Sequence, residues 1–255
     1  MGTVDLESRG PVRIVRIVRP EARNALDLAM MRGLREAAKT IRRDRESRAV
    51  VITGCDGIFA AGGDLRAFSR VKSADGGRRI ARRGHEVIDA FIALGVPIVA
   101  ALNGDAFGGG CELATACDYR IMESQARLHW VQGRFAVTTA WGATGRLVNS
   151  VGAGVAARWL LTAAVVSARE AAAVGYAHEE VATGTSLEAA VAWCERVAVI
   201  PRSTTRRQLG LIRATGGRSP DESRELEMRV FGEGWGSRVH HEAVARFLAR
   251  TRVQP

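Results

Sequence analysis

Apolar residues are spaced along this chain in two different periods. Three short runs rich in β-branched residues, Val12–Val18 (VRIVRIV), Ala49–Thr53 (AVVIT) and Ile98–Leu102 (IVAAL), are each bounded by Pro or Gly and predict buried strands. Residues 25–43 and 73–94 instead carry apolar side chains at spacings of three and four. This spacing predicts amphipathic helices, the second of which begins after a polar Gly-rich loop that opens the stretch 73–94. Because strand and helix alternate, the pattern favours an α/β fold.

The second half of the chain is predicted to be largely helical. After a helix at 112–117, a strand near 119–122 and a loop region at 124–143, we expect helices at 155–161, 168–174, 187–197, 204–212 and 243–250. Pro201 and the segment GGRSP at 216–220 are the expected hinges. We therefore predict an α/β core at residues 1–200 and a C-terminal helical element at residues 201–255.

A chain of 255 residues with 47% hydrophobic and 25% charged residues has the composition of a soluble globular protein with one large core. No uncharged apolar stretch reaches the ~20 residues that a membrane span needs. The N-terminus has no apolar segment after a basic start, so we expect no secretory signal and a cytoplasmic location.

Cysteines and charge add little functional information. The four cysteines form no CxxC pair and have no His at zinc-finger spacing, so we expect reduced thiols and no metal site. The net charge is +10, yet only Lys39 and Lys72 are lysines. Such an excess of arginine is typical of a compositional bias of the source genome. The charge alone therefore does not indicate a polyanionic partner.

Two glycine-rich turns are the first candidates for chemistry. They are AGGDL at residues 61–65 and GGGCE at 108–112, and each comes after a predicted strand. Without Cβ atoms, such turns let a ligand approach backbone N–H groups closely, and the second turn opens a helix. Two converging N–H groups would form an oxyanion hole, which stabilises negative charge that develops on a carbonyl oxygen, as in an enolate. The alternative is that both turns are ordinary connections from strand to helix.

Four motifs in order give the chain a resemblance to a known family. They are RPEARNAL (19–26), TGCDGIFAAGGDL (53–65), VPIVAALNGDAFGGGCELATACDYRI (96–121) and WGATGRL (141–147). From about residue 12 to residue 250, the sequence resembles the enoyl-CoA hydratase/isomerase, or crotonase, superfamily. The resemblance implies a spiral of ββα units with a C-terminal helical trimerisation element, in a homotrimer or a dimer of trimers.

The same resemblance implies an acyl-CoA substrate, with no cofactor besides the coenzyme A that the substrate carries. Its thioester carbonyl would lie between the N–H groups of Gly63 and Gly109. Further residues would bind the substrate along the coenzyme A path, two of them from a neighbouring subunit: Ala25, Ala61, Asp64, Leu65, Phe247 and Arg250. A guanidinium suits a phosphate, although Arg250 is equally well explained as a solvated surface charge.

Glu112 matches one of the two glutamates that hydratases of this family use to activate water. The family spacing places the second glutamate at or near Gln132, whose amide cannot exchange a proton near neutral pH. This departure puts simple hydration in doubt. Glu112 alone would then serve as acid, base or water-orienting group, or merely as a carboxylate at a helix N-terminus.

Other segments resemble the ethylmalonyl/methylmalonyl-CoA decarboxylases. These are CDYRIM (117–122), AWGATGRLVNSVG (140–152) and FGEGWG (231–236). Loss of carbon dioxide from a malonyl thioester leaves an enolate, which needs an oxyanion hole and one later protonation, so no second carboxylate is required. Trp141 and Trp235 would shield the departing carboxylate from water, whereas core packing is the ordinary explanation for either tryptophan. Decarboxylation is therefore the predicted activity.

Three alternatives stay open. The first is an enoyl-CoA hydratase or isomerase that uses Glu112, and the second is an acyl-CoA-binding protein without catalysis. The third is RNA binding through four cations at helical spacing: Arg32, Arg35, Lys39 and Arg42. A solvated helix face is the ordinary explanation for these residues, and nucleic acid is not the expected partner. His129, three residues before Gln132, is a further candidate for approach to the pocket.

Overall fold

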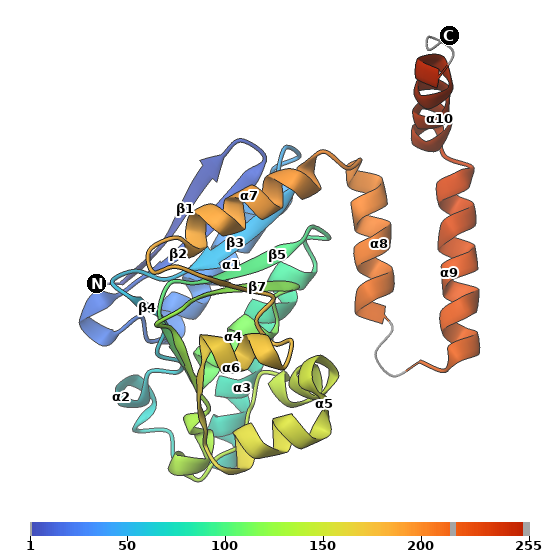
Figure 1. The fold of residues 1–255 in the computed structure, drawn as a ribbon. Helices are drawn as coiled ribbons and strands as arrows, with labels where there is room; N and C mark the ends of the chain where they lie inside the picture. Colours follow the sequence, from blue (N-terminus) through green and yellow to red (C-terminus); the bar gives the residue numbers. More distant parts are fainter. Residues whose placement is uncertain (1, 215–217, 252–255) are drawn as a thin grey trace. The chain divides into compact units, whose positions relative to one another are not determined.

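The computed structural model describes residues 2–214 and 218–251. It divides into two compact units, Met1–Ala198 and Val199–Pro255. Figure 1 shows the sheets in the larger unit and a run of helices in the smaller one.

The main sheet of the larger unit confirms the predicted strands. In the part of the chain that the structure describes it has six strands in the order β1-β2-β3-β5-β7-β10. These are β1 (Thr3–Arg9), β2 (Val12–Val18), β3 (Ala49–Thr53), β5 (Ile98–Leu102), β7 (Tyr119–Glu123) and β10 (Glu179–Val181). The first two strands form an antiparallel hairpin, and the others pair in parallel.

Helices cover both faces of this sheet, which is why its strands are continuous apolar runs. Along β3, Val50 and Ile52 pack with α1 (Leu28–Arg43) and α3 (Ala74–Ile92) in one cluster. Ala49 and Val51 pack on the opposite face with α7 (Ser186–Ala198). Figure 1 shows α7 lying across that face.

A second sheet turns the chain into a spiral. It has the order β4-β6-β8-β9, with β4 (Ile58–Ala60), β6 (Asp105–Phe107), β8 (Arg127–His129) and β9 (Val165–Ser167). The chain passes repeatedly from the main sheet to this second sheet: in each of the pairs β3–β4, β5–β6 and β7–β8, the first strand belongs to the main sheet and the second to the second sheet. Helices follow each pair: α2 (Leu65–Phe68) and α3, then α4 (Gly109–Thr115), then η2 (Val131–Phe135) and α5 (Ala143–Leu161). This is the predicted succession of ββα units.

Several predicted helix boundaries were wrong, and the largest difference is in α5, which begins at Ala143 rather than residue 155. Helix α1 begins at Leu28 rather than residue 25, because Leu26 forms an isolated β-bridge with Gly63 and the side chain of Asp27 caps the helix. Helix α3 begins at Ala74, capped by Ser73, so the Gly-rich segment predicted as a loop is helical. The expected loop at 124–143 also contains β8 and η2.

The smaller unit contains α8 (Arg202–Ala214), α9 (Pro220–Trp235) and α10 (Arg238–Thr251). Helix α9 was missed from the sequence, although Ser219 and Glu222 form a capping box around Pro220, a recognised helix start. Of the predicted hinge at 216–220, residues 216 and 217 lie outside the described residues, and Pro220 opens α9. The predicted boundary after residue 200 lies two residues beyond the division between the units.

Candidate active site

Three neighbouring parallel strands deliver the candidate residues to one place. Strand β4 pairs with β6, and β6 pairs with β8, all in parallel. The carboxyl ends of parallel strands meet at one edge of a sheet, where ligands bind in α/β proteins. Gly63 follows β4, Gly109 follows β6, and Gln132 follows β8. Residues separated by 69 positions in the sequence therefore converge because of strand order alone.

The two glycine-rich turns pack tightly against each other. Gly62 has φ of +80°, and a Cβ at this position would lie 2.8 Å from the backbone nitrogen of Gly109 and 2.6 Å from the carbonyl oxygen of Phe107. Only glycine meets both the left-handed backbone and the lack of space. The close approach of backbone to backbone thus requires Gly62.

Both predicted donors have N–H groups free for a ligand. In the bridge between Leu26 and Gly63, the Gly62 carbonyl accepts from the Leu26 N–H (2.7 Å) and the Asp64 N–H donates to the Leu26 carbonyl (3.2 Å). The N–H of Gly63 consequently faces away from Leu26. Gly109 is the first residue of α4, where an N–H has no partner within the helix. Neither N–H donates a hydrogen bond within residues 2–214 and 218–251.

Both glycines line a single cavity of about 570 Å³. Most of its lining is apolar, and of the described residues around it only Lys72 and Glu112 are ionisable. A cavity of this size and character is typical of a site for a small organic ligand. The sequence-predicted residues that line it are Ala61, Gly63, Leu65, Gly109, Glu112, Gln132 and Trp141.

Backbone amides from another loop hold the Glu112 carboxylate. Its Oε2 accepts from the N–H of Trp141 (2.6 Å) and of Ala140 (3.0 Å), and the residue is only 3% exposed. Burial raises the pKa of Glu112 above its usual value, although the N–H groups of Trp141 and Ala140 oppose this shift. Glu112 is therefore an oriented carboxyl group whose acid form is favoured more than in water.

Gln132 lies directly beside Glu112. Its Nε2 donates to Glu112 Oε1 at 3.2 Å, whereas its buried Oε1 has no hydrogen-bond partner in the described structure. The position that the family spacing assigns to a second carboxylate thus faces Glu112, but it carries an amide. Such a pair contains one group that transfers protons near neutral pH.

Trp141 forms one wall of the cavity and is 4% exposed. Two glycines make room for its indole ring. A Cβ on Gly109 would lie 2.8 Å from its Cη2, and a Cβ on Gly84 of α3 would overlap the ring. The ring therefore packs between α3 and α4, while its backbone N–H holds Glu112.

Comparison with known proteins explains this arrangement. The sequence matches the family model for enoyl-CoA hydratase/isomerase over residues 7–254. The chain belongs to this family. It is similar to the crotonyl-CoA hydratase of Syntrophomonas wolfei, with 31% identity over 251 residues that cover 97% of this chain and 95% of that one.

A decarboxylase is also among the relatives of the chain. The ethylmalonyl-CoA decarboxylase of Mus musculus is 27% identical over 249 residues, covering 96% of this chain and 77% of that protein. The solved structure of Pseudomonas aeruginosa DspI matches with a TM-score of 0.91 and 30% identity, covering 97% of this chain and 94% of that one. The predicted crotonase fold is confirmed, and the family identifies the chain as an acyl-CoA-processing enzyme.

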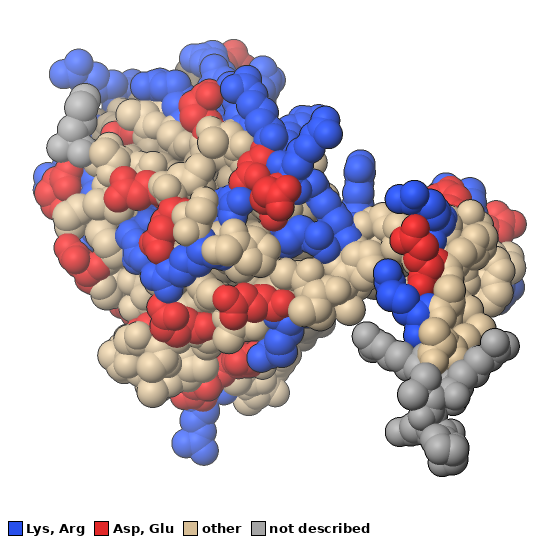
Figure 2. All heavy atoms as spheres, turned by 90° about the horizontal axis from the view of Figure 1, so that it is seen from above, with Lys and Arg blue, Asp and Glu red and all other residues tan. Residues whose placement is uncertain are grey.

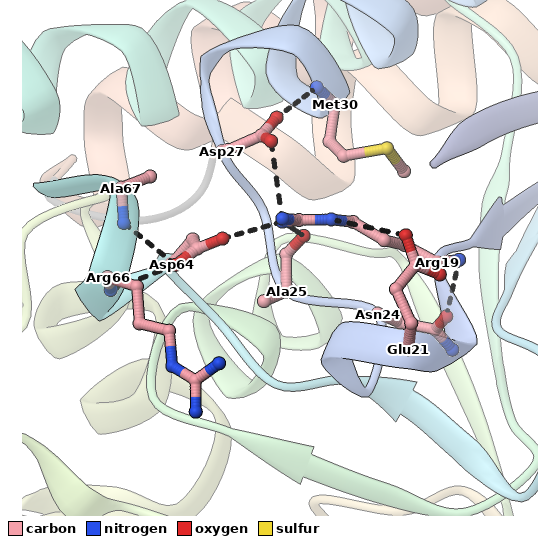
Figure 3. A network of polar contacts seen from close by, with 9 residues as sticks. All are labelled: Arg19, Glu21, Asn24, Ala25, Asp27, Met30, Asp64, Arg66 and Ala67. Atoms are coloured by element: carbon pink, nitrogen blue, oxygen red, sulfur yellow. Dashed lines mark hydrogen bonds and ion pairs between the residues drawn. The ribbon is translucent and has the colours of Figure 1, made fainter. Parts of the chain in front are cut away.

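Other predicted residues of this family member lie outside the cavity lining. Ala25 and Asp64 belong to the pairing around Gly63, where both contact Arg19 (Figure 3). Trp235 and Phe247 are exposed residues of α9 and α10 in the smaller unit. The backbone of Arg250 belongs to α10, but its side chain lies outside the described part of the structure.

His129 does not line the cavity. Its Nε2 lies 3.0 Å from Asp105 Oδ2, and its ring stacks on Phe107 at 4.0 Å between centroids. Its backbone carbonyl accepts from the N–H of Gly108, beside the second glycine-rich turn. The imidazole is thus engaged on the strands of the second sheet.

Sequence reasoning missed two features of the cavity. Lys72 lines it from the loop between α2 and α3, and the backbone of Ala140 binds Glu112. The hydrogen bond from the Ala140 N–H to Glu112 does not depend on which residue stands at position 140, so the sequence does not reveal it. Lys72 stood out as one of two lysines, but no role was predicted for it. Among the described residues, no cluster of His, Cys, Asp or Glu is suited to a metal ion, and no helix is long and apolar enough to cross a membrane.

The basic helix offers little support for RNA binding. On α1, Lys39 pairs with Glu36 at 2.6 Å, and Arg35 pairs with Glu86 of α3 at 2.9 Å. Half of the four predicted cations thus have acidic partners. Figure 2 shows Lys and Arg over the face seen from above, with Asp and Glu between them. This mixture is the usual surface of a solvated protein.

Proposed function

We propose that this enzyme decarboxylates a malonyl-type CoA thioester, such as methylmalonyl-CoA or ethylmalonyl-CoA, through a thioester enolate. The observation that carries the proposal is the pairing of Glu112 with the amide of Gln132 at 3.2 Å. Concerted addition of water to an enoyl thioester benefits from two carboxyl groups, one as base and one as acid. Decarboxylation needs a site for the oxyanion and one proton donor.

In the proposed first step, the thioester oxygen accepts hydrogen bonds from the N–H groups of Gly63 and Gly109. The bond between Cα and the free carboxylate breaks, carbon dioxide leaves, and the electron pair moves through Cα to the thioester oxygen. The two N–H groups, both unpartnered in the described structure, stabilise the resulting enolate. Loss of one such donor typically raises the barrier by about 3–4 kcal/mol.

In the second step, Cα takes a proton and the enolate electrons return to form the Cα–H bond. Glu112 is the proposed donor, directly or through a water molecule. Because burial raises the pKa of Glu112, its acid form is present at a higher pH than for an exposed glutamate. The coenzyme A of the substrate remains attached throughout, and the proposed reaction consumes one proton, releases carbon dioxide and uses no other cofactor.

The apolar lining favours departure of the substrate carboxylate. Trp141, Phe68 and Ile80 are among the residues that line the cavity. A carboxylate placed there exchanges hydration for apolar contacts, whereas the transition state spreads the charge toward the two N–H groups. The proposed site thus lowers the barrier at the reacting carbon.

Hydration of an enoyl-CoA is the second candidate function, and the relatives named as hydratases support it. Purified enzyme should be incubated separately with methylmalonyl-CoA, ethylmalonyl-CoA and crotonyl-CoA. Release of carbon dioxide as the faster reaction is the expected result. Faster loss of the enoyl-thioester absorbance would instead establish hydration. Binding of CoA thioesters without either reaction would identify a non-catalytic acyl-CoA-binding protein.

Two substitutions of Gly109 distinguish the loss of its N–H donor from the steric effect of an added side chain. Gly109→Ala and Gly109→Pro both add a Cβ against Trp141, but only Pro removes the donor. We expect decarboxylation to fall at least ~100-fold further in Gly109→Pro than in Gly109→Ala, since one oxyanion donor contributes ~100-fold or more. Equal rates in two folded variants would contradict the role of this N–H.

We also propose that the enzyme is a homotrimer or a dimer of trimers. Large apolar side chains exposed on α9 and α10 support this: Met228, Phe231, Trp235, Phe247 and Leu248. Contiguous exposed apolar surface is typical of subunit interfaces. In such an assembly Phe247 and Arg250 would reach the coenzyme A of a neighbouring subunit. Light scattering of the purified protein would give the subunit number.

A further inference from the structure

One guanidinium joins the two chain segments that meet beside the first glycine-rich turn (Figure 3). Arg19 Nη1 donates to Asp64 Oδ2 at 2.7 Å and to the Ala25 carbonyl at 3.1 Å, and it lies 3.4 Å from Asp27 Oδ2. The side chains of Arg19 and Asp64 are 18% and 10% exposed. This charge-assisted contact is therefore well shielded from water.

The other oxygen of Asp64 fixes the segment that follows. Oδ1 accepts from the N–H groups of Arg66 (2.9 Å) and Ala67 (3.0 Å), which caps α2. The Ala67 N–H and the Arg19 guanidinium both contribute to a pKa of Asp64 below its usual value. Asp64 is thus an ionised carboxylate with both oxygens occupied.

These contacts surround a backbone that has little restraint of its own. Gly62 and Gly63 lack Cβ atoms, so their own torsion angles are less limited than those of other residue types. The backbone bonds of Leu26 hold one side of Gly63, and Arg19 holds Ala25 on one segment and Asp64 on the other. Arg19 does not line the cavity. Its influence on a ligand must pass through the turn.

We infer that Arg19 is a positioning residue that, through Asp64 and Ala25, directs the Gly63 N–H into the cavity; the inference rests on the proposed function of that N–H. Electrostatic stabilisation of an oxyanion requires donors that are already oriented before the reaction. Flanking glycines allow the close approach of substrate but provide no orientation. The contacts of Arg19 with Asp64 and Ala25 supply that orientation.

The test measures polarisation of the thioester carbonyl rather than stability. Butyryl-CoA labelled with ¹³C at the thioester carbonyl is bound to the enzyme, and its C=O stretch is recorded by infrared difference spectroscopy. In the parent enzyme we expect a shift to lower wavenumber relative to free butyryl-CoA. In Arg19→Met we expect a smaller shift and kcat for methylmalonyl-CoA lowered about 100-fold, with a lesser change in KM. Arg19→Lys, which keeps the charge beside Asp64, should restore part of both.

Arg13→Met is the matched control, since Arg13 forms another partly buried pair, with Asp44 at 2.5 Å, and does not line the cavity. It should lower thermal stability but leave the carbonyl shift unchanged. If Arg19→Met does not fold, Asp64→Asn removes the ionic contact while keeping an oxygen for the cap, and the same smaller shift is expected.

The outcomes separate the two proposals. A parent enzyme that binds butyryl-CoA without any carbonyl shift would refute the proposed oxyanion hole itself. A shift in the parent that persists undiminished in folded Arg19→Met or Asp64→Asn would leave the oxyanion hole intact and overturn the positioning role of Arg19.

Discussion

Gln132 donates a hydrogen bond from Nε2 to Oε1 of Glu112 across 3.2 Å. The contact joins residues that follow two neighbouring strands, β6 and β8. It gives the cavity an ordered carboxyl group with an amide beside it. The proposed chemistry therefore rests on one proton-transferring group, Glu112, and two backbone donors.

Gln132→Glu should convert this pair into two carboxyl groups about 3 Å apart. Because both cannot ionise at that distance, one pKa rises further. We expect hydration of crotonyl-CoA to appear or increase, measured as loss of enoyl-thioester absorbance. A raised carboxyl pKa makes the folded state less stable as pH rises through it. Urea unfolding should therefore show a loss of about 1–3 kcal/mol at pH 7 that diminishes toward pH 5. Hydration no greater than in the parent would argue against this account of the missing carboxylate.

Glu112→Gln should change the pH dependence of decarboxylation without abolishing the reaction. The acid form of Glu112 is the proposed donor, and burial raises its pKa, so kcat of the parent should fall as pH rises through that value. In Glu112→Gln this limb should vanish, with an overall loss smaller than in Gly109→Pro. A parallel pH profile in parent and variant would exclude Glu112 as the titrating donor.

Gly84→Ala should displace the ring of Trp141. A Cβ at Gly84 would overlap the indole, and this overpacking is expected to lower the free energy of unfolding by about 1–3 kcal/mol. Decarboxylation should also slow, because the Trp141 N–H holds Glu112. Gly77→Ala, in the same helix but with open space around the new Cβ, is the control for stability alone, because Gly77 also lines the cavity; its free energy of unfolding should be unchanged or raised by up to about 1 kcal/mol. Similar losses in both variants would indicate an effect of the helix rather than of Trp141.

The fold was predictable where one local pattern decides it. Strands β2, β3 and β5 have the predicted bounds because their apolar runs are buried on both faces of a parallel sheet. The position of Gln132 opposite a glutamate followed from family spacing. By contrast, the N–H groups of Ala140 and Trp141 reach Glu112 from 28 and 29 residues away, and backbone donors leave no signature in the sequence.

Long-range pairs of common residue types were equally hidden. Arg19 and Asp64 are 45 residues apart, and in a chain so rich in arginine nothing marks this one. Helix α9 was different, since Ser219, Pro220 and Glu222 are a readable start signal that was taken for part of a hinge. Tertiary contacts, rather than propensities, account for most of what the sequence did not reveal about the site.

Gly62→Ala should separate catalysis from folding most clearly. Gly62 and Gly57 both have positive φ, +80° and +67°, so an added Cβ strains either backbone by about 1–2 kcal/mol. Only at Gly62 does that Cβ also meet the nitrogen of Gly109, at 2.8 Å, whereas at Gly57 nothing lies within 4 Å. Urea unfolding should show a stability loss in both variants that is larger in Gly62→Ala because of this contact, and only Gly62→Ala should lower kcat, by about 100-fold or more, because it pushes the two N–H donors apart. If Gly57→Ala lowered kcat as much as Gly62→Ala, the loss would arise from general destabilisation, and the close packing of the two turns would have no special part in the reaction.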